Sequence, residues 1–233
     1  MVGPWLQTLE LVSQANLLTS DPGHLLMSNP ADLLISSPDR TLMEIAPMLN
    51  QVVGVDLDSG VDVRRLKAVI SSDEDEASVG LRVVIGSQPD IVFEELGRFS
   101  IVEVGPGLPA PPHGEPAAIV GLHGFSDRSS ASDTSFSMQM IDDWGIEDVM
   151  ASALDLASRQ GRELAVLFDL AVLDPAFDRD RTTPGGLDLR RLFRAARACG
   201  RRPDVAAAGF VKAASEVNLV HAVLSFCAGL AGR

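Results

Sequence analysis

The chain has 233 residues, of which 46% are hydrophobic, and its formal net charge at pH 7 is −13. This length suits one domain with a sizeable core, and the acidic balance argues against nucleic acid or an anionic membrane as a partner. No apolar run approaches the roughly 18 residues that indicate a membrane-spanning helix.

Residues 1–40 are predicted to form an irregular N-terminal segment, and residues 41–233 a single α/β domain. Three prolines divide the first segment, at Pro22, Pro30 and Pro38, and proline is poorly tolerated inside helices and central strands. The elements predicted next are a short helix at 41–50, a strand at 52–55 and a second short helix at 61–70.

Strands and helices then alternate along the rest of the chain. Short apolar runs predict buried strands, and apolar residues at helical spacing predict the helices between them. This alternation indicates a mainly parallel sheet covered on both faces, a three-layer α/β/α sandwich. The predicted strands are 81–85, 99–104, 117–121, 164–169 and 205–211, and the predicted helices are 89–96, a helix that ends at 160, 187–199 and 216–230.

The last predicted helix carries two apolar stripes, whereas one is enough for a surface helix. The first stripe contains Val217, Val220, Leu224 and Cys227, and the second contains Leu219, Val223, Phe226 and Leu230. The sheet can cover only one of them. The second stripe therefore predicts a further layer, supplied by residues 1–40 or by another chain.

The stretch 164–187 is the most informative part of the sequence. Its apolar strand ends at the carboxylate of Asp169, and open parallel sheets bind ligands at that edge. Asp174-Pro175 and the turn T-P-G-G-L that ends at Leu187 are expected to fix a long rigid loop before the next helix.

The run F-D-L-A-V-L-D-P that contains Asp169, followed by T-P-G-G-L, resembles the metal-binding strand of the arginase, agmatinase and formimidoylglutamase family, the ureohydrolases. That family has S-F-D-x-D-x-x-D-P in this strand. The segment F-S-M-Q-M-I-D-D-W-G-I-E-D-V-M also resembles the family's F-T-M-x-D-I-D-x-x-G-I-x-x-V-M. The resemblance implies a trimmed arginase-like fold and, in intact members, a site for two manganese ions.

The motifs that hold metal in the family are altered in this chain. The resemblance places the six ligand positions at Gln88, Gly105, Gly107, Pro109, Asp169 and Ala171. Only Asp169 remains a carboxylate, and a two-metal hydrolase needs several carboxylates and imidazoles to hold its ions and activate water. The glutamate that orients the substrate in the family is matched by Lys212, which reverses the charge. We therefore predict no metal, no cofactor and no catalytic residue.

His113 is the residue that argues for residual activity. Its context, P-H-G-E-P, resembles the family's N-L-H-G-x-P, whose histidine shuttles protons beside the substrate. The loops on both sides are shortened, and a solvated loop histidine is the simpler interpretation. His113 and Asp169 are therefore residual catalytic candidates only.

Other patterns carry weaker hypotheses. His123 near Ser126 and Asp127 lacks the G-x-S-x-G elbow of a hydrolase triad, and the acidic run at 73–76 lacks calcium-loop spacing, so a solvated loop is preferred to a cation site. The arginines between 190 and 202 form either a solvated helix face or a protein contact. Neither cysteine has metal-ligand spacing, and no basic secretory signal region is visible, so we expect buried free thiols in a cytoplasmic protein.

Together these patterns predict a catalytically inactive arginase-fold protein that acts as a structural or regulatory subunit. The resemblance implies an oligomer with itself or with a metal-retaining paralogue. The acidic balance predicts no nucleic-acid or membrane partner. Two alternatives remain open. One is a small-molecule binding protein that uses the emptied cleft, and the other is a residual or repurposed C–N hydrolase that uses Asp169 and His113.

Overall fold

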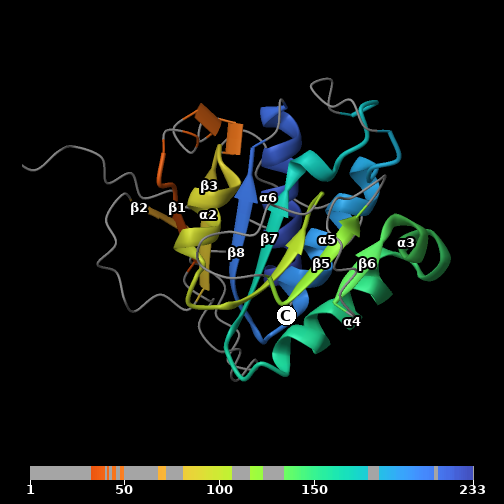
Figure 1. The fold of residues 1–233 in the computed structure, drawn as a ribbon. Helices are drawn as coiled ribbons and strands as arrows, with labels where there is room; N and C mark the ends of the chain where they lie inside the picture. Colours follow the sequence, from red (N-terminus) through yellow and green to blue (C-terminus); the bar gives the residue numbers. More distant parts are fainter. Residues whose placement is uncertain are drawn as a thin grey trace, which may run out of the picture.

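The computed structural model describes residues 33–39, 41, 44–45, 48–49, 68–71, 81–106, 116–122, 134–177, 184–212 and 215–232. Their strands form one 8-stranded sheet in the order β2-β1-β3-β8-β7-β4-β5-β6, as Figure 1 shows. Every pairing between neighbouring strands is parallel. The predicted α/β fold with a mainly parallel sheet is confirmed.

The elements follow the alternation that the sequence predicts. The strands are β1 (Leu33–Ser36), β2 (Ala68–Ser71), β3 (Leu81–Gly86), β4 (Ser100–Val104), β5 (Ala118–Leu122), β6 (Ser135–Ser137), β7 (Leu164–Asp169) and β8 (Val205–Val211). The helices are α2 (Pro89–Glu95), α3 (Met138–Trp144), α4 (Ile146–Ser158), the 3-10 turn η2 (Leu170–Val172), α5 (Leu189–Arg201) and α6 (Glu216–Ala231). Residues 41, 44–45 and 48–49 are also helical.

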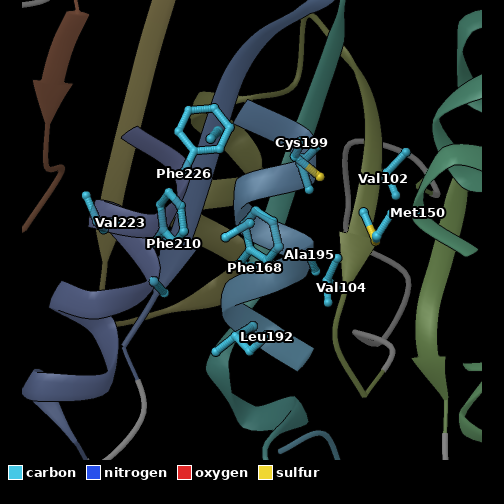
Figure 2. Close-up of a cluster of buried hydrophobic side chains, with 14 of the residues drawn as sticks. Val102, Val104, Met150, Phe168, Leu192, Ala195, Cys199, Phe210, Val223 and Phe226 are labelled. Carbon is cyan, nitrogen blue, oxygen red and sulfur yellow. The ribbon is translucent and has the colours of Figure 1, made fainter. Parts of the chain in front are cut away.

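Two apolar cores lie on opposite faces of the sheet, because successive strand residues point to opposite sides. On one face α2 packs Val92, Phe93 and Leu96 against the sheet. The larger core on the other face includes residues of α4, α5 and α6. At its centre Phe168 of β7 stacks on Phe210 of β8 at 5.1 Å between ring centroids, and Phe226 of α6 meets Phe210 edge-on at 6.0 Å (Figure 2).

Helix α6 is covered within the chain, which corrects the expectation that its second stripe needs another layer. Helices α5 and α6 approach closely at two glycines: a Cβ on Gly200 would lie 2.1 Å from the carbonyl oxygen of Phe226, and one on Gly229 would lie 2.2 Å from that of Arg197. The sheet and α5 together bury both stripes, except for the partly buried Leu224 and the exposed Val217.

The N-terminal third differs from the prediction. Leu33–Ser36, expected to be irregular, forms β1 inside the sheet between β2 and β3. Residues 68–70, predicted as the end of a helix, belong to strand β2. In such short apolar segments the spacing of hydrophobic residues does not distinguish a helix from a strand. Their pairing with neighbouring strands determines the structure instead. Residues 1–32 and the strand predicted at 52–55 lie outside the described residues.

The arginines of α5 form ion pairs within the chain. Arg191 contacts Asp142 of α3 at 2.6 Å, Arg194 contacts Glu147 of α4, and Arg202 contacts Asp155 of α4 at 2.9 Å. The stripe between 190 and 202 thus joins α5 to α3 and α4 through ion pairs that stay partly exposed, which fits a solvated face. Within the described part of the chain, no helix has the length and apolar character to cross a membrane.

Candidate functional site

The carboxyl ends of four adjacent strands, β3, β8, β7 and β4, bring the family-matched positions to one edge of the sheet. Gly86 ends β3, Val211 ends β8, Asp169 ends β7 and Val104 ends β4. The residues that follow are Ser87, Lys212, the η2 turn and Gly105. The carboxyl end of the sheet, where the sequence predicts a ligand site, is therefore the place to which the fold brings these residues.

Asp169 is buried, with 3% of its surface exposed. Its Oδ1 accepts a hydrogen bond of 2.9 Å from the backbone N–H of Ala171, so the carboxylate caps the η2 turn. Ala171 is itself buried within that turn. The residue matched to the family's second aspartate is thus a methyl group packed beside the carboxylate that remains.

Glu103 of β4 is a second carboxylate that the sequence analysis missed. It is fully buried and lies on the same side of the sheet as Asp169, two residues before Gly105. A Cβ built on Gly105 would lie 2.9 Å from Glu103 Oε1 and 3.2 Å from Asp169 Cβ. Glu103 therefore fills the space that a side chain at position 105 would need. A glutamate inside the apolar strand S-I-V-E-V was the signal that could have identified it.

Gln88 does not turn towards a metal centre in this fold. It is exposed and occupies the N-cap position of α2 without a side-chain cap. Gly107, Pro109 and His113 lie outside the described residues. Within the described ranges, no group of three or more histidine, cysteine, aspartate or glutamate side chains could hold a metal ion. These residues do not fit the two-manganese centre that the fold family implies.

Lys212 follows β8 at the position matched to a family glutamate. Its Nζ donates to Glu44 Oε2 at 2.6 Å and to Glu216 Oε1 of α6 at 3.0 Å. These hydrogen bonds, first the one to Glu44 and then the one to Glu216, raise the pKa of Lys212. The ammonium group is therefore charged near neutral pH, and a cationic substrate would meet a fixed positive charge.

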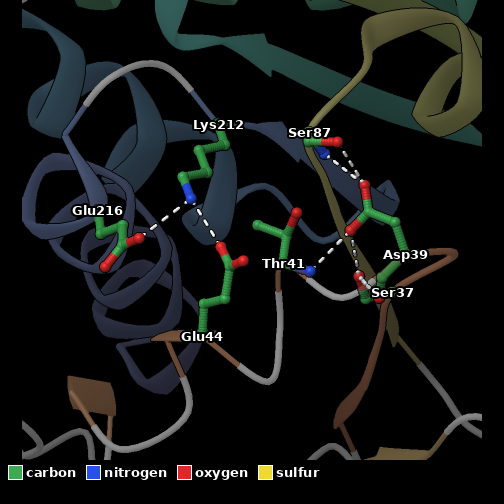
Figure 3. Close-up of polar contacts among 7 residues, drawn as sticks. All are labelled: Ser37, Asp39, Thr41, Glu44, Ser87, Lys212 and Glu216. Atoms are coloured by element: carbon green, nitrogen blue, oxygen red, sulfur yellow. Dashed lines mark hydrogen bonds and ion pairs between the residues drawn. The ribbon is translucent and has the colours of Figure 1, made fainter.

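Asp39 lies beside the end of β3 and was also missed, because it belongs to the segment predicted to be irregular. Its carboxylate accepts hydrogen bonds from Thr41 N at 2.8 Å, Ser37 Oγ at 3.1 Å, and both the N–H and the Oγ of Ser87 at 2.7 Å (Figure 3). Partial burial acts to raise the pKa of Asp39, but the bonds from Thr41 and Ser87 outweigh it and hold the pKa well below its usual range.

The ends of the loop between η2 and α5 are fixed as the sequence predicts. Asp174 Oδ2 accepts from Gly185 N at 2.8 Å, and Leu187 N donates to the carbonyl oxygen of Val172 at 2.8 Å. Gly186 packs so closely that a Cβ there would lie 2.4 Å from that oxygen. Residues 178–183, in the middle of the loop, lie outside the described range.

Of the remaining histidines and cysteines, the structure describes His221, Cys199 and Cys227. His24, the acidic run 73–76 and the set His123, Ser126 and Asp127 lie outside the described residues. His221 is on the exposed side of α6, with its ring 5.8 Å from that of Phe193. Cys199 and Cys227 are free and buried, and burial raises the pKa of both thiols, so neither is a reactive nucleophile.

Comparison with known proteins identifies the family that the sequence resembles. A model of the arginase family matches residues 111–219. A Trypanosoma cruzi formiminoglutamase solved with manganese superposes with a TM-score of 0.65 at 15% identity, covering 91% of this chain and 97% of that chain. A search of curated protein sequences finds no significant match.

Two further solved structures share the fold. The formimidoylglutamase of Bacillus subtilis has a TM-score of 0.65 at 13% identity, covering 86% of this chain and 87% of its own. The agmatine ureohydrolase of Thermoplasma volcanium has a TM-score of 0.59 at 12% identity, covering 86% of this chain and 90% of its own. Identities this low show the fold alone. With the family match at 111–219, the predicted ureohydrolase resemblance is confirmed.

Proposed function

We propose that this protein of the arginase family is catalytically inactive and serves as a structural or regulatory subunit, in an oligomer with itself or with a metal-retaining paralogue. The composition of the carboxyl edge of the sheet carries the proposal. Beside Asp169, the family's ligand positions hold an exposed amide at Gln88, no side chain at Gly105 and a methyl group at Ala171. The position matched to the substrate-orienting glutamate holds Lys212.

This set of side chains lacks what two-metal hydrolysis requires. The family's chemistry depends on two ions that turn a bridging water into hydroxide near neutral pH. Hard divalent ions need several oxygen or imidazole ligands each, whereas the described edge supplies the carboxylates of Asp169 and Glu103 from neighbouring strands. The ammonium of Lys212 adds a positive charge near the end of β8.

The catalytic half of the proposal is tested with arginine, agmatine and guanidinobutyrate in the presence of manganese. Urea release should not exceed that of a mock purification. Urea production that disappears in an Asp169→Ala or a His113→Ala variant would instead support the residual hydrolase.

Exposed apolar side chains support the subunit half of the proposal. Among the described residues the large ones are Trp144, Phe177 and Val217, with 53%, 40% and 55% exposed. Phe177 and Val217 belong to adjoining segments, because Asn218 Nδ2 of α6 donates to the carbonyl oxygen of Phe177 at 3.1 Å. Exposed apolar groups that cluster on a surface are typical of protein contacts.

The association is tested by light scattering of the chain alone and mixed with each metal-retaining arginase-family protein of its host. The expected result is a species larger than the 24.7 kDa monomer. A Phe177→Ser/Val217→Ser double variant should associate more weakly. Trp144→Ser serves as the matched control, because it removes an equally exposed apolar side chain from α3, a different element from the two segments that the proposal places in the contact. A clean monomer that binds no such paralogue contradicts the proposal.

A second candidate, a binding protein for a small cation, is favoured by one observation. Glu103 and Asp169 are two buried carboxylates on the neighbouring strands β4 and β7, and buried carboxylates attract a cationic group. Calorimetry with agmatine separates the candidates: binding that is lost in Glu103→Gln supports the binder. In either case we propose a cytoplasmic protein, because its two unpaired thiols suit reducing conditions.

A further inference from the structure

A strap, defined as the described residues between 37 and 49, crosses the carboxyl ends of β3 and β8. Its apolar side is anchored, because Ile45 and Leu49 are buried in the larger core. Its polar side presents two carboxylates to the sheet edge, Asp39 and Glu44 (Figure 3). The strap therefore holds two negative charges against the ends of two neighbouring strands.

The groups that receive these carboxylates are all hydrogen-bond donors. Ser87 offers its N–H and its hydroxyl to Asp39 Oδ2, both at 2.7 Å. Lys212 offers its ammonium to Glu44 Oε2 at 2.6 Å. The two donor residues are close neighbours, since Lys212 N donates to the carbonyl oxygen of Gly86 at 2.8 Å. Backbone N–H, hydroxyl and ammonium together form a set that recognises carboxylates.

We propose that the ends of β3 and β8 form a binding site for a small dicarboxylate, and that Asp39 and Glu44 of the strap occupy this site as an intramolecular substitute. The structure already shows that these donors bind two carboxylates, because Ser87 donates to Asp39 and Lys212 donates to Glu44. The charge preference is opposite to that of a guanidinium substrate. The inference goes beyond the proposed function and does not depend on whether the chain binds metal.

The strap carboxylates are placed where a ligand could displace them. The side chains of Lys212 and Glu44 keep 23% and 49% of their surface exposed, and Ser87 is exposed. Ion pairs at this exposure contribute little to stability. The apolar anchors Ile45 and Leu49 keep the strap near the edge after release. The arrangement is that of an autoinhibitory contact, in which the ligand and the strap compete.

Glu216 limits how tightly the site can bind. It also accepts from Lys212, at 3.0 Å, and it belongs to α6, so it stays in place when the strap leaves. The ammonium has three donor hydrogens, and one of them remains committed to Glu216. A ligand therefore forms the same interaction with the ammonium of Lys212 that Glu44 forms now, while the interaction with Glu216 stays in place.

The test is an NMR titration with succinate, a dicarboxylate of the proposed class. The wild-type chain is compared with an Asp39→Asn/Glu44→Gln double variant and with the same double variant that also carries Lys212→Met. We expect the double variant to bind succinate at least tenfold more tightly than wild type, and the Lys212→Met addition to abolish the gain. Glu95→Gln is the matched control, since it breaks the ion pair of Arg82 at similar exposure on another surface.

Each outcome bears on the proposal. Equal affinities of wild type and double variant, or a gain that survives Lys212→Met, overturns it. Equally tight binding of sulfate overturns the dicarboxylate assignment. If the double variant does not fold, the test uses wild type, where the Ser87 N–H at the end of β3 donates to Asp39 Oδ2 of the strap. Succinate should then shift the amide resonance of Ser87 as it replaces the Asp39 carboxylate, and an unchanged Ser87 resonance at saturation contradicts the proposal.

Discussion

Replacing either glycine at the contact between α5 and α6 should destabilise the protein, although alanine is the better helix former. In the helix interior alanine is favoured over glycine by about 1 kcal/mol. Against this, the new Cβ at Gly200 would lie 2.1 Å from a backbone oxygen, whereas ordinary contacts begin at 3.4 Å. The difference is 1.3 Å, and a backbone oxygen cannot rotate away as a side chain can, so the two helices must separate.

Overpacking of this kind typically costs about 1–3 kcal/mol, occasionally more. Subtracting the propensity gain of about 1 kcal/mol, we expect Gly200→Ala to lose up to about 2 kcal/mol, which lowers the melting temperature of a domain this size by up to roughly 8 °C. Gly229→Ala should behave alike. Arg201→Ala, on the exposed side of α5, is the control and should be neutral or stabilising. A stabilised Gly200→Ala would refute the close contact between these helices, and with it the covering of α6 by α5.

Three further predictions follow from particular contacts. Phe210→Ala, at the centre of the aromatic stack, should cost about 3–5 kcal/mol, measured by chemical unfolding, whereas the exposed Phe177→Ala should cost little. The pKa of Asp39 is depressed because hydrogen bonds outweigh partial burial, so its carboxylate stabilises the native state above the unfolded pKa near 3.9 and this contribution is lost as the pH falls through the native pKa. In thermal melts, Asp39→Asn should therefore have a lower melting temperature than wild type at pH 7, and this difference should shrink in strong acid. Arg194→Ala breaks an exposed ion pair and should change the free energy of unfolding by less than about 1 kcal/mol, with no change in oligomeric state.

The strands and helices from residue 81 onward could be predicted because their apolar periods are long and their caps explicit. Ser215 shows this well: its Oγ accepts from Asn218 N, as an N-cap does. Gly145, with a φ of 88°, ends α3 and separates it from α4, so the predicted helix to 160 corresponds to α4 and the segment before it forms the separate helix α3. Strand β6 escaped prediction because three residues at a sheet edge carry no periodic signal.

The candidate site was predictable only where a strand end carries a charged residue. Asp169 was found because it interrupts an apolar run, and Lys212 was found through the family resemblance. Glu103 was missed although it interrupts the apolar strand S-I-V-E-V, because its nearness to Asp169 follows from the pairing of β4 with β7. Asp39 and Glu44 were missed because their partners, Ser87 and Lys212, are 48 and 168 residues away in sequence, and no local pattern encodes such contacts.

The α6 stripes show how a local rule can mislead. The helix is apolar on two sides because it lies between the sheet and α5, and this sandwiched position follows from the two glycines that let α5 approach. A stripe count alone cannot separate a helix covered by a neighbouring helix from one covered by another chain. The association proposed for this protein therefore rests on exposed residues such as Phe177 and Val217 instead.

The central claim is that the family's two-manganese centre is lost, and metal analysis of protein purified without chelators tests it most directly. The account predicts manganese far below one ion per chain, and no change in melting temperature when manganese is added. Specific binding at a hundredfold excess over the dissociation constant would stabilise the native state by about 2.7 kcal/mol. One or two manganese ions per chain, with stabilisation of that order that is lost in Asp169→Ala, would contradict the account.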